Sequence, residues 1–272
     1  MSDRVSVTVD GGVADVRLDR PDKMNALDPA MFAAIVEAGE ALKHDASVRA
    51  VVLSGEGRGF CAGLDFTSFQ AMASSDGDGG GDGGTAAISR TDDRLTHLGQ
   101  QAAWVWTEVP VPVIAAVHGP CLGGGLQIAL GADLRIVAPD VRLSVLEVRW
   151  GITPDMTASV TLPRLVGLDV AKELTWTGRT VGGEEAVRLG LATRVADDPR
   201  AASLELAREL ASKSPGALRA GKALFEGAAG RTLAEQLAQE REAIRSLIGT
   251  RNQVEAVTAA FEKRAPVFDD AV

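Results

Sequence analysis

The sequence predicts an α/β protein in which buried strands, glycine turns and helices follow one another in repeated units. Two segments carry this prediction: VRAVVLSG at 48–55 and VPVIAAV at 111–117 are rich in valine, as strands buried on both faces are. The first strand leads into the glycine-rich turn GEGRGFCAGL, and the second leads into HGPCLGGG, which an apolar helical run follows. A strand, glycine turn and helix that recur in one chain are typical of an α/β fold.

The chain opens with a predicted hairpin and a helix. Residues 5–18, VSVTVDGGVADVRL, alternate apolar and polar side chains on either side of DGG at 10–12, which supplies the turn between two strands. A helix follows because Asp28 provides an N-cap and Pro29 fits the first helical position. Apolar side chains at helical spacing carry this helix to about His44.

The stretch at 73–94 predicts a flexible loop. Residues 76–84 are only Gly and Asp, so the segment has few apolar groups to offset the entropy lost on ordering. A tolerated surface insertion fits this composition. A flap over a site fits as well, because the loop joins the two glycine turns.

Helical patterns dominate the sequence from Glu184 onward. We therefore divide the chain into a core at 1–198 and a helical C-terminal region at 199–272. Helices are predicted at 184–189, 200–213, 215–227, 232–248 and 252–263. One of them carries an apolar face that we expect to help form a trimer, made of Leu233, Leu237, Ile244, Leu247 and Ile248.

Composition and charge exclude several kinds of partner. The 272 residues carry a net charge of -9, which disfavours nucleic acid and anionic membrane surfaces, since both are bound mainly through an excess of Lys and Arg. No run of about 18 apolar residues occurs, and the start MSDR lacks the apolar part of a signal peptide, so we expect a cytoplasmic protein without membrane contact. The 2 cysteines and 3 histidines have no metal-site spacing, so no metal is expected.

Gly123, Gly124 and Gly125 stand at the start of a predicted helix, where three glycines are costly to order. Something is therefore expected to approach their backbone closely. A phosphate or an oxyanion would fit, because both are bound by the N–H groups of glycine turns. The turn lacks the ending of a P-loop and the spacing of a dinucleotide site. A second turn at 62–65 also follows a strand, and two converging N–H groups favour the oxyanion.

Two carboxylates are candidates for acid and base chemistry. Glu147 and Asp155 stand among apolar residues, with a turn at Gly151 and Pro154 between them, so they are able to face one cavity. The alternative is that Glu147 pairs with a neighbouring Arg and that Asp155 caps the helix beginning near Thr157.

Other side chains with chemical potential have structural interpretations. His118 has no acidic partner at an obvious spacing and is expected to be a structural histidine. Trp150 and Trp176 are expected in the core or in the wall of a pocket.

Five segments in order, RPDKMNALDPAMF, GEGRGFCAGLDF, VHGPCLGGGLQIALGADLRI, EVRWGITPD and GRTVGGEEAVRLGLATRV, resemble the enoyl-CoA hydratase/isomerase family, the crotonase superfamily. The similarity covers about residues 5–268. The resemblance implies a crotonase-like spiral of ββα units with a helical C-terminal trimerisation region, and a homotrimer or a hexamer of two trimers. It also implies an acyl-CoA thioester substrate, with coenzyme A as part of the substrate and no further cofactor.

The resemblance also implies roles for individual residues. The backbone N–H groups of Leu64 and Gly124 match the family's oxyanion hole. The family's coenzyme A contacts match Lys23, Met24 and Ala26 near the nucleotide, and Ala62, Gly63 and Asp65 along the pantetheine and adenine. Local positive charge for the phosphates is expected from Arg20, Lys23 and Arg58. The segment AFEKRAPVF resembles a tail that reaches a neighbouring subunit's coenzyme A, with its aromatic residue shifted to Phe261.

The acid and base positions depart from the two-glutamate pattern of the family's hydratases, because the matching residues are Gln127 and Glu147. A glutamine orients a water or the acyl chain without accepting a proton, so a Gln127→Glu variant would supply the missing carboxylate. Glu147 and Asp155 match the pair of dienoyl-CoA isomerases, and this favours isomerisation of an enoyl-CoA double bond. Hydration by Glu147 alone and a catalytically silent acyl-CoA-binding protein remain alternatives.

Overall fold

The computed structural model describes residues 3–65 and 95–270, and the predicted loop at 73–94 falls outside this range. Its main sheet has the strand order β1-β2-β3-β4-β6-β8, in which only the β1–β2 pair is antiparallel. The strands are β1 (Val5–Asp10), β2 (Val13–Leu18), β3 (Ala50–Gly55), β4 (Val113–Val117), β6 (Leu134–Val137) and β8 (Arg194–Val195). The predicted α/β class is confirmed.

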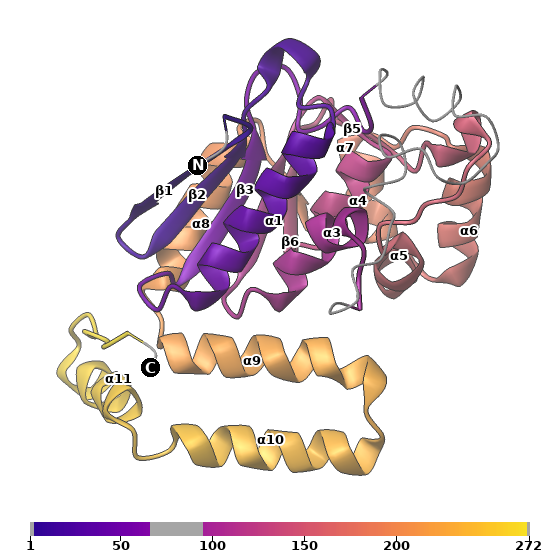
Figure 1. Ribbon diagram of the computed structural model, residues 1–272. Coiled ribbons are helices and arrows are strands. Elements are labelled where there is room, and N and C mark those ends of the chain that lie inside the picture. The colour runs from indigo at the N-terminus through magenta and orange to yellow at the C-terminus, as the bar shows by residue number, and fades with distance from the viewer. Residues whose placement is uncertain (1–2, 66–94, 271–272) are drawn as a thin grey trace.

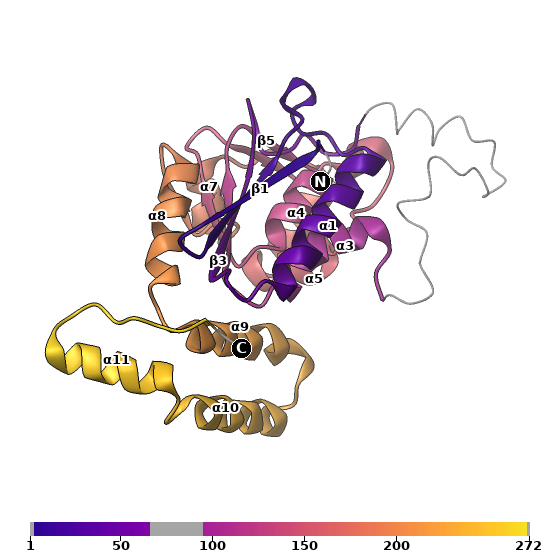
Figure 2. The same ribbon diagram turned by 60° about the vertical axis from the view of Figure 1, so that its left-hand side comes forward.

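Helices cover both faces of this sheet. Figure 2 shows α1 (Pro29–His44), α3 (Leu98–Glu108) and α4 (Gly124–Leu130) on one face and α8 (Pro199–Ala211) on the other. Successive side chains of β3 enter different cores, since Val51 packs with the first three helices and Val52 packs against α8. This is why the strand is apolar at nearly every position.

The N-terminal predictions hold at residue level. The hairpin turns at Gly11 and Gly12, whose φ values of 55° and 80° lie in the region that glycine enters most easily. Asp28 caps α1 by accepting a hydrogen bond of 2.7 Å from the Met31 amide, and the helix ends at His44 as expected.

The second half of the chain is mostly helical. After β5 (Pro120–Leu122) and β7 (Arg142–Ser144), which form a small parallel sheet, the turn η2 (Glu147–Trp150) leads to the later helices. These are α5 (Ala158–Val166), α6 (Leu168–Thr177), α7 (Gly183–Leu189), α9 (Pro215–Gly227), η3 (Ala228–Gly230), α10 (Leu233–Leu247) and α11 (Arg251–Glu262). Among the helices of the described residues, none has both the length and the apolar character needed to cross a membrane.

Helices α9, α10 and α11 form an arm that lies beyond one end of the sheet (Figure 1). α10 packs on α9, with Leu247 beside Gly216, so Leu247 belongs to the contact inside the arm. The other predicted apolar side chains of α10 that are exposed are Leu233, Leu237, Ile244 and Ile248.

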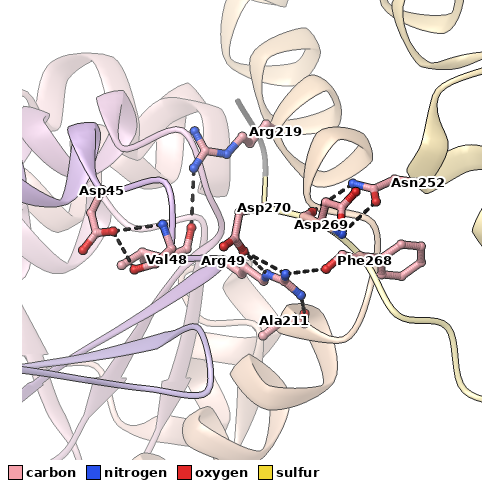
Figure 3. Close-up of polar contacts among 10 residues, drawn as sticks. Asp45, Val48, Arg49, Ala211, Arg219, Asn252, Phe268, Asp269 and Asp270 are labelled. Carbon is pink, nitrogen blue, oxygen red and sulfur yellow. Dashed lines mark hydrogen bonds and ion pairs between the residues drawn. The ribbon is translucent and has the colours of Figure 1, made fainter.

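A polar junction ties the chain after α11 to the start of β3 (Figure 3). The Arg49 guanidinium donates hydrogen bonds of 2.8 Å to the Phe268 carbonyl oxygen and to the Asp270 carboxylate. Asn252 and Asp269 exchange two bonds, of 3.0 Å and 2.9 Å, which hold the same segment against α11. Arg49 therefore links the arm to the edge of the core.

We predict that Arg49→Met releases residues 265–270 without unfolding the sheet, because the variant loses the charged bonds to the segment and keeps most of the side-chain volume. Amide hydrogen exchange should accelerate in 265–270 and stay slow in β3. The exposed Arg208 on α8 offers the matched control Arg208→Met, which should leave both regions unchanged. Unaltered exchange in 265–270 after Arg49→Met would show that the junction does not hold the segment.

Candidate active site

The two glycine turns predicted from the sequence lie side by side. The Phe60 amide donates to the His118 carbonyl at 2.9 Å, the Cys61 amide donates to the Pro120 carbonyl at 3.0 Å, and the Leu122 amide returns to the Cys61 carbonyl at 3.0 Å. This backbone ladder fixes the turn after β3 against the turn after β4. His118 also bonds the Gly57 carbonyl oxygen at 3.0 Å, as expected for a structural histidine.

The segment before α1 completes this arrangement. The Leu27 amide donates to the Gly63 carbonyl at 2.8 Å, and the Asp65 amide donates to the Leu27 carbonyl at 3.0 Å. These bonds use the residues on either side of Leu64 and turn the N–H of Leu64 itself away from Leu27. Within 3–65 and 95–270, the amides of Leu64 and Gly124 donate to no backbone carbonyl oxygen.

Asn25 is an organising residue that the sequence analysis missed. Its buried side-chain amide donates to the carbonyl oxygens of Glu56, Gly59 and Phe60, and its side-chain oxygen accepts from the Arg20 amide. Its φ of 56° is left-handed, a conformation that asparagine tolerates better than most residues. An asparagine just before the capped helix was the available signal.

Each of the three consecutive glycines has a different neighbour. Gly123 has a φ of 52°, and a β-carbon there would lie 3.4 Å from Oε1 of Glu147. A β-carbon on Gly124 would lie 2.9 Å from side-chain atoms of Leu27 and Met156. On Gly125 it would lie 2.6 Å from the Cys61 carbonyl oxygen. The glycines therefore permit close approach to their backbone, as expected. At Gly125 the approaching group is the protein itself, because this glycine lets the turn after β4 contact Cys61 in the turn after β3.

The turns border a cavity of about 670 Å³. Its wall is mostly apolar, with Leu27, Phe32, Leu64, Leu146, Trp150, Ile152 and Met156 among the lining residues. The carboxyl groups that line it in the described part of the chain belong to Glu147 and Asp155, so the prediction that both face one cavity is confirmed. Gln127 lines the same cavity.

Glu147 is the more buried of the two acids, with 6% of its surface exposed. Its Oε1 accepts a hydrogen bond of 2.6 Å from Nε2 of Gln127. Glu147 thus bonds to Gln127 and not to a neighbouring Arg, which was the alternative interpretation of the sequence. Its Oε2 is buried and has no hydrogen-bond partner. Burial is the main cause that raises the pKa of Glu147, and the backbone N–H of Glu147 itself and the bond from Gln127 oppose the rise.

Asp155 lies at the rim of the cavity and is more exposed than Glu147. Partial burial nevertheless raises the pKa of its carboxyl group, while the nearby His97 opposes the rise. The N-cap of α5 is Thr157, and no side-chain capping bond is present there, so the alternative of Asp155 as a helix cap is wrong.

His97 is a second residue that the sequence analysis did not use. It stands at the N-cap of α3, where its Nδ1 accepts from the Gln100 amide at 3.2 Å. The capping pattern was readable from the sequence, but the proximity to Asp155 depends on how α3 packs against α5 through the intervening helix α4.

Two of the residues expected near coenzyme A pair with each other. Oδ2 of the buried Asp65 lies 2.6 Å from Nη1 of Arg20, and Asp65 does not line this cavity. Arg20 therefore takes part in an ion pair within the protein. Trp150 lines the cavity as expected and is 50% exposed, whereas Trp176 is 69% exposed and belongs to neither the core nor this cavity.

The remaining predicted contacts divide between the cavity and its supports. Ala62 and Gly63 line the cavity together with Leu64 and Gly124. Met24 supports the glycine turn, because its carbonyl oxygen accepts from the Ala62 amide at 2.9 Å. Lys23 is exposed beside it and Ala26 is buried, and neither lines the cavity.

The surroundings of the turns offer little metal or thiol chemistry. Within the described ranges, no group of three or more His, Cys, Asp or Glu side chains is placed to hold a metal ion. Cys61 and Cys121 are free and buried in the paired turns. Burial raises the pKa of the Cys61 thiol to about 12 and that of Cys121 well above its usual value.

Comparison with known proteins places this geometry in context. Residues 8–271 match the family model described as enoyl-CoA hydratase/isomerase. The chain is 34% identical over 256 residues to the human mitochondrial Delta(3,5)-Delta(2,4)-dienoyl-CoA isomerase, covering 93% of this chain and 77% of that protein. It is also 34% identical over 267 residues to a Mycobacterium leprae protein named probable enoyl-CoA hydratase echA8, covering 97% of each.

Solved structures agree with the sequence comparisons. The crystal structure of an enoyl-CoA hydratase from Polaromonas sp. JS666 superposes with a TM-score of 0.86 at 29% identity, covering 97% of this chain and 99% of that one. The expected crotonase-like fold is therefore confirmed for the described residues.

We predict that Gly125→Ala destabilises the protein by about 1–3 kcal/mol, the usual cost of overpacking, because the added carbon meets the Cys61 backbone. Denaturant unfolding measures this change. Gly182→Ala is the matched control, since Gly182 has a φ of -86° and open space where the new carbon would lie. The paired-turn interpretation fails if the two variants are equally stable.

Proposed function

The chain belongs to the enoyl-CoA hydratase/isomerase family, and from this membership and the cavity geometry we propose that it isomerises the double bond of an enoyl-CoA thioester with Glu147 and Asp155. One observation carries the proposal: two carboxyl groups line one apolar cavity, and one of them has a buried oxygen atom without a partner. Gln127, another polar residue in that wall, is an amide and cannot act as a base.

The amides of Leu64 and Gly124 are our candidates for binding the thioester oxygen. They border the cavity from the two paired turns, and the ladder between the turns holds them without reorganisation. Each such donor typically lowers the barrier by on the order of 3 kcal/mol when charge develops on the oxygen. Under this assignment, Gly124 lacks a side chain because one would crowd the approach of the thioester oxygen to its amide.

The two carboxyl groups then divide the proton transfers. One ionised carboxylate removes a proton from a carbon of the acyl chain, and the electron pair moves through the conjugated bonds onto the thioester oxygen. The other carboxyl group gives its proton to a different carbon, and the thioester carbonyl reforms. The net result is a moved double bond with no change in composition. Raised pKa values suit this exchange, since they bring a carboxyl group closer to neutral pH.

Coenzyme A is held outside the apolar cavity in this proposal. Ala62 and Gly63 would follow the pantetheine, while Lys23, Met24 and Ala26 would lie near the nucleotide. With Arg20 paired to Asp65, the positive charge for the phosphates falls to Lys23 and Arg58, which are both exposed. No cofactor beyond the coenzyme A of the substrate is needed.

Hydration by Glu147 alone is the second candidate. It is favoured by the relative from Mycobacterium leprae, whose printed name is that of a hydratase and whose identity equals that of the human isomerase. A catalytically silent acyl-CoA-binding protein is less well supported, because both carboxyl groups line the cavity instead of being paired away from it.

We predict that Glu147→Gln and Asp155→Asn each lower turnover of the preferred thioester at least about a hundredfold, as expected for the loss of a general acid or base. Affinity for coenzyme A should change little. The measurement is a panel of enoyl-CoA and dienoyl-CoA thioesters, with products identified by mass and ultraviolet absorbance. Isomerisation leaves the mass unchanged, whereas hydration adds one water.

The two functions separate in the Asp155→Asn variant. Under isomerisation this variant loses activity, and under hydration by Glu147 alone it keeps it. Full activity in both variants would remove the two carboxyl groups from the mechanism. Wild-type protein that binds the thioesters without turning any over would support the silent alternative.

A trimer, or a hexamer of two trimers, and a cytoplasmic location complete the proposal. The exposed apolar side chains of α10 are the basis for the oligomer, because unpaired apolar surface on a helix favours a contact between copies. Ile244 is 54% exposed and central to this surface.

We predict that light scattering at micromolar concentration reports a trimer or hexamer and that Ile244→Glu lowers the oligomeric state, because a charge would be buried in the contact. Gln239→Glu adds the same charge at an exposed polar position of α10 and should have a smaller effect. A wild-type monomer would contradict the proposed contact.

A further inference from the structure

Gln127 has both polar atoms of its side chain committed to the protein. Its Nε2 donates to Oε1 of Glu147 at 2.6 Å. Its Oε1 accepts from the amides of Met156 at 2.9 Å and Ala158 at 3.3 Å. Only 1% of the residue is exposed. The glutamine therefore joins α4 to η2 and to the start of α5.

These bonds fix the orientation of the side-chain amide. Two backbone N–H groups point at one end of it, and only the oxygen atom accepts hydrogen bonds. The nitrogen atom must then face Glu147. An N–H group donates and does not accept, so Oε1 of Glu147 has to be the acceptor in this pair.

The two oxygen atoms of Glu147 consequently differ. When the carboxyl group is protonated, the proton cannot sit on Oε1 without facing the N–H of Gln127, so it sits on Oε2. Oε2 is the buried atom that lacks a partner, and Glu147 lines the cavity. The same atom is left free to take a proton when the carboxyl group is ionised.

Gln127 also connects the two acids. Asp155 directly precedes Met156, whose amide Gln127 holds, so one side chain fixes Glu147 and the backbone next to Asp155. Asp155 is the charged group whose field acts on Glu147, and it raises the pKa of Glu147, while His97 acts on Asp155 in turn.

We propose that Gln127 is a positioning residue. It makes Oε2 of Glu147 the atom that exchanges the proton, and it holds Glu147 in a fixed position relative to the turn that carries Asp155. The inference deepens the proposed function and rests on it for its catalytic meaning. It adds to the expected role of holding a water or the acyl chain, because Oε1 and one N–H of Nε2 are bonded to the protein.

The proposal changes what a glutamate at this position would do. The two backbone amides would bind one of its oxygen atoms, and the carboxyl group would then face Oε1 of Glu147 without an N–H to donate. Two carboxyl groups at hydrogen-bond distance share one proton, and they titrate as a pair with one raised pKa. Gln127→Glu should therefore hinder Glu147 as a base, instead of creating a second one.

The first experiment measures the ionisation of Glu147 without any substrate. Carbon-13 NMR of protein labelled at the glutamate carboxyl carbon follows the titration, and the signal missing from Glu147→Gln assigns it. Gln127→Met keeps the approximate shape and removes the donated hydrogen bond, so the pKa of Glu147 should rise by about one unit or more. Gln127→Glu should raise it as well, through the shared proton. Thr161→Val removes the hydrogen bond of another buried side chain, made to the Thr157 carbonyl oxygen, and should leave the titration unchanged.

The second experiment measures pH profiles on the best thioester. If ionised Glu147 is the base, activity appears as pH rises through its pKa, so a higher pKa in Gln127→Met moves the acid limb of kcat/KM upward by the same amount. On the acid side of the profile, below the pKa, we expect the variant to be about tenfold slower for each unit by which the pKa rises, because less of Glu147 is ionised. KM should stay nearly constant, because Gln127 bonds to the protein through both of its polar atoms.

The outcomes separate the two proposals. A folded Gln127→Met protein with unchanged titration of Glu147 overturns the positioning of Glu147, and so does a Gln127→Glu variant that gains hydratase turnover. A rise in KM with unchanged kcat would return Gln127 to substrate binding. If no thioester is turned over by wild-type protein, the proposed function fails, while the titration still decides whether Gln127 controls Glu147. Thermal unfolding of every variant confirms that each is folded.

Discussion

The backbone ladder between the two glycine turns is the constraint on which the site depends. It brings together segments about sixty residues apart in the chain, and residues of both turns line the cavity. The ladder requires backbones in contact, and Gly125 permits this against Cys61. The strands that precede the turns are buried in both cores, so the sheet forms a rigid base for the two turns.

The cavity contains a feature that is unfavourable for folding stability, and it lies at Glu147. A buried carboxyl oxygen without a partner is unfavourable for folding. The glutamine at 127 limits the cost by donating to the other oxygen atom. Glu147 thus has one oxygen atom bonded within the protein and one without a partner.

Much of the fold was predictable because its signals are local. The capping aspartate and proline located the first helix, and valine-rich runs located β3 and β4. The helix predicted at 215–227 matches α9 at both ends. The site was less predictable. The pairing of charged side chains depends on residues that are distant in the chain, so the ion pair between Arg20 and Asp65 could not be predicted from any local sequence pattern. Gln127 was placed correctly in the cavity, but its partners come from two other elements, and no spacing within one element reveals them.

The two buried thiols carry a practical consequence. Cys61 and Cys121 occupy facing positions in the ladder, one on each turn, and their raised pKa values keep them as unreactive thiols while the turns stay paired. A thiol reagent can reach them only after the two turns separate. Their rate of labelling therefore reports how often the paired turns beside the cavity open, and the native sequence allows this measurement without any added probe.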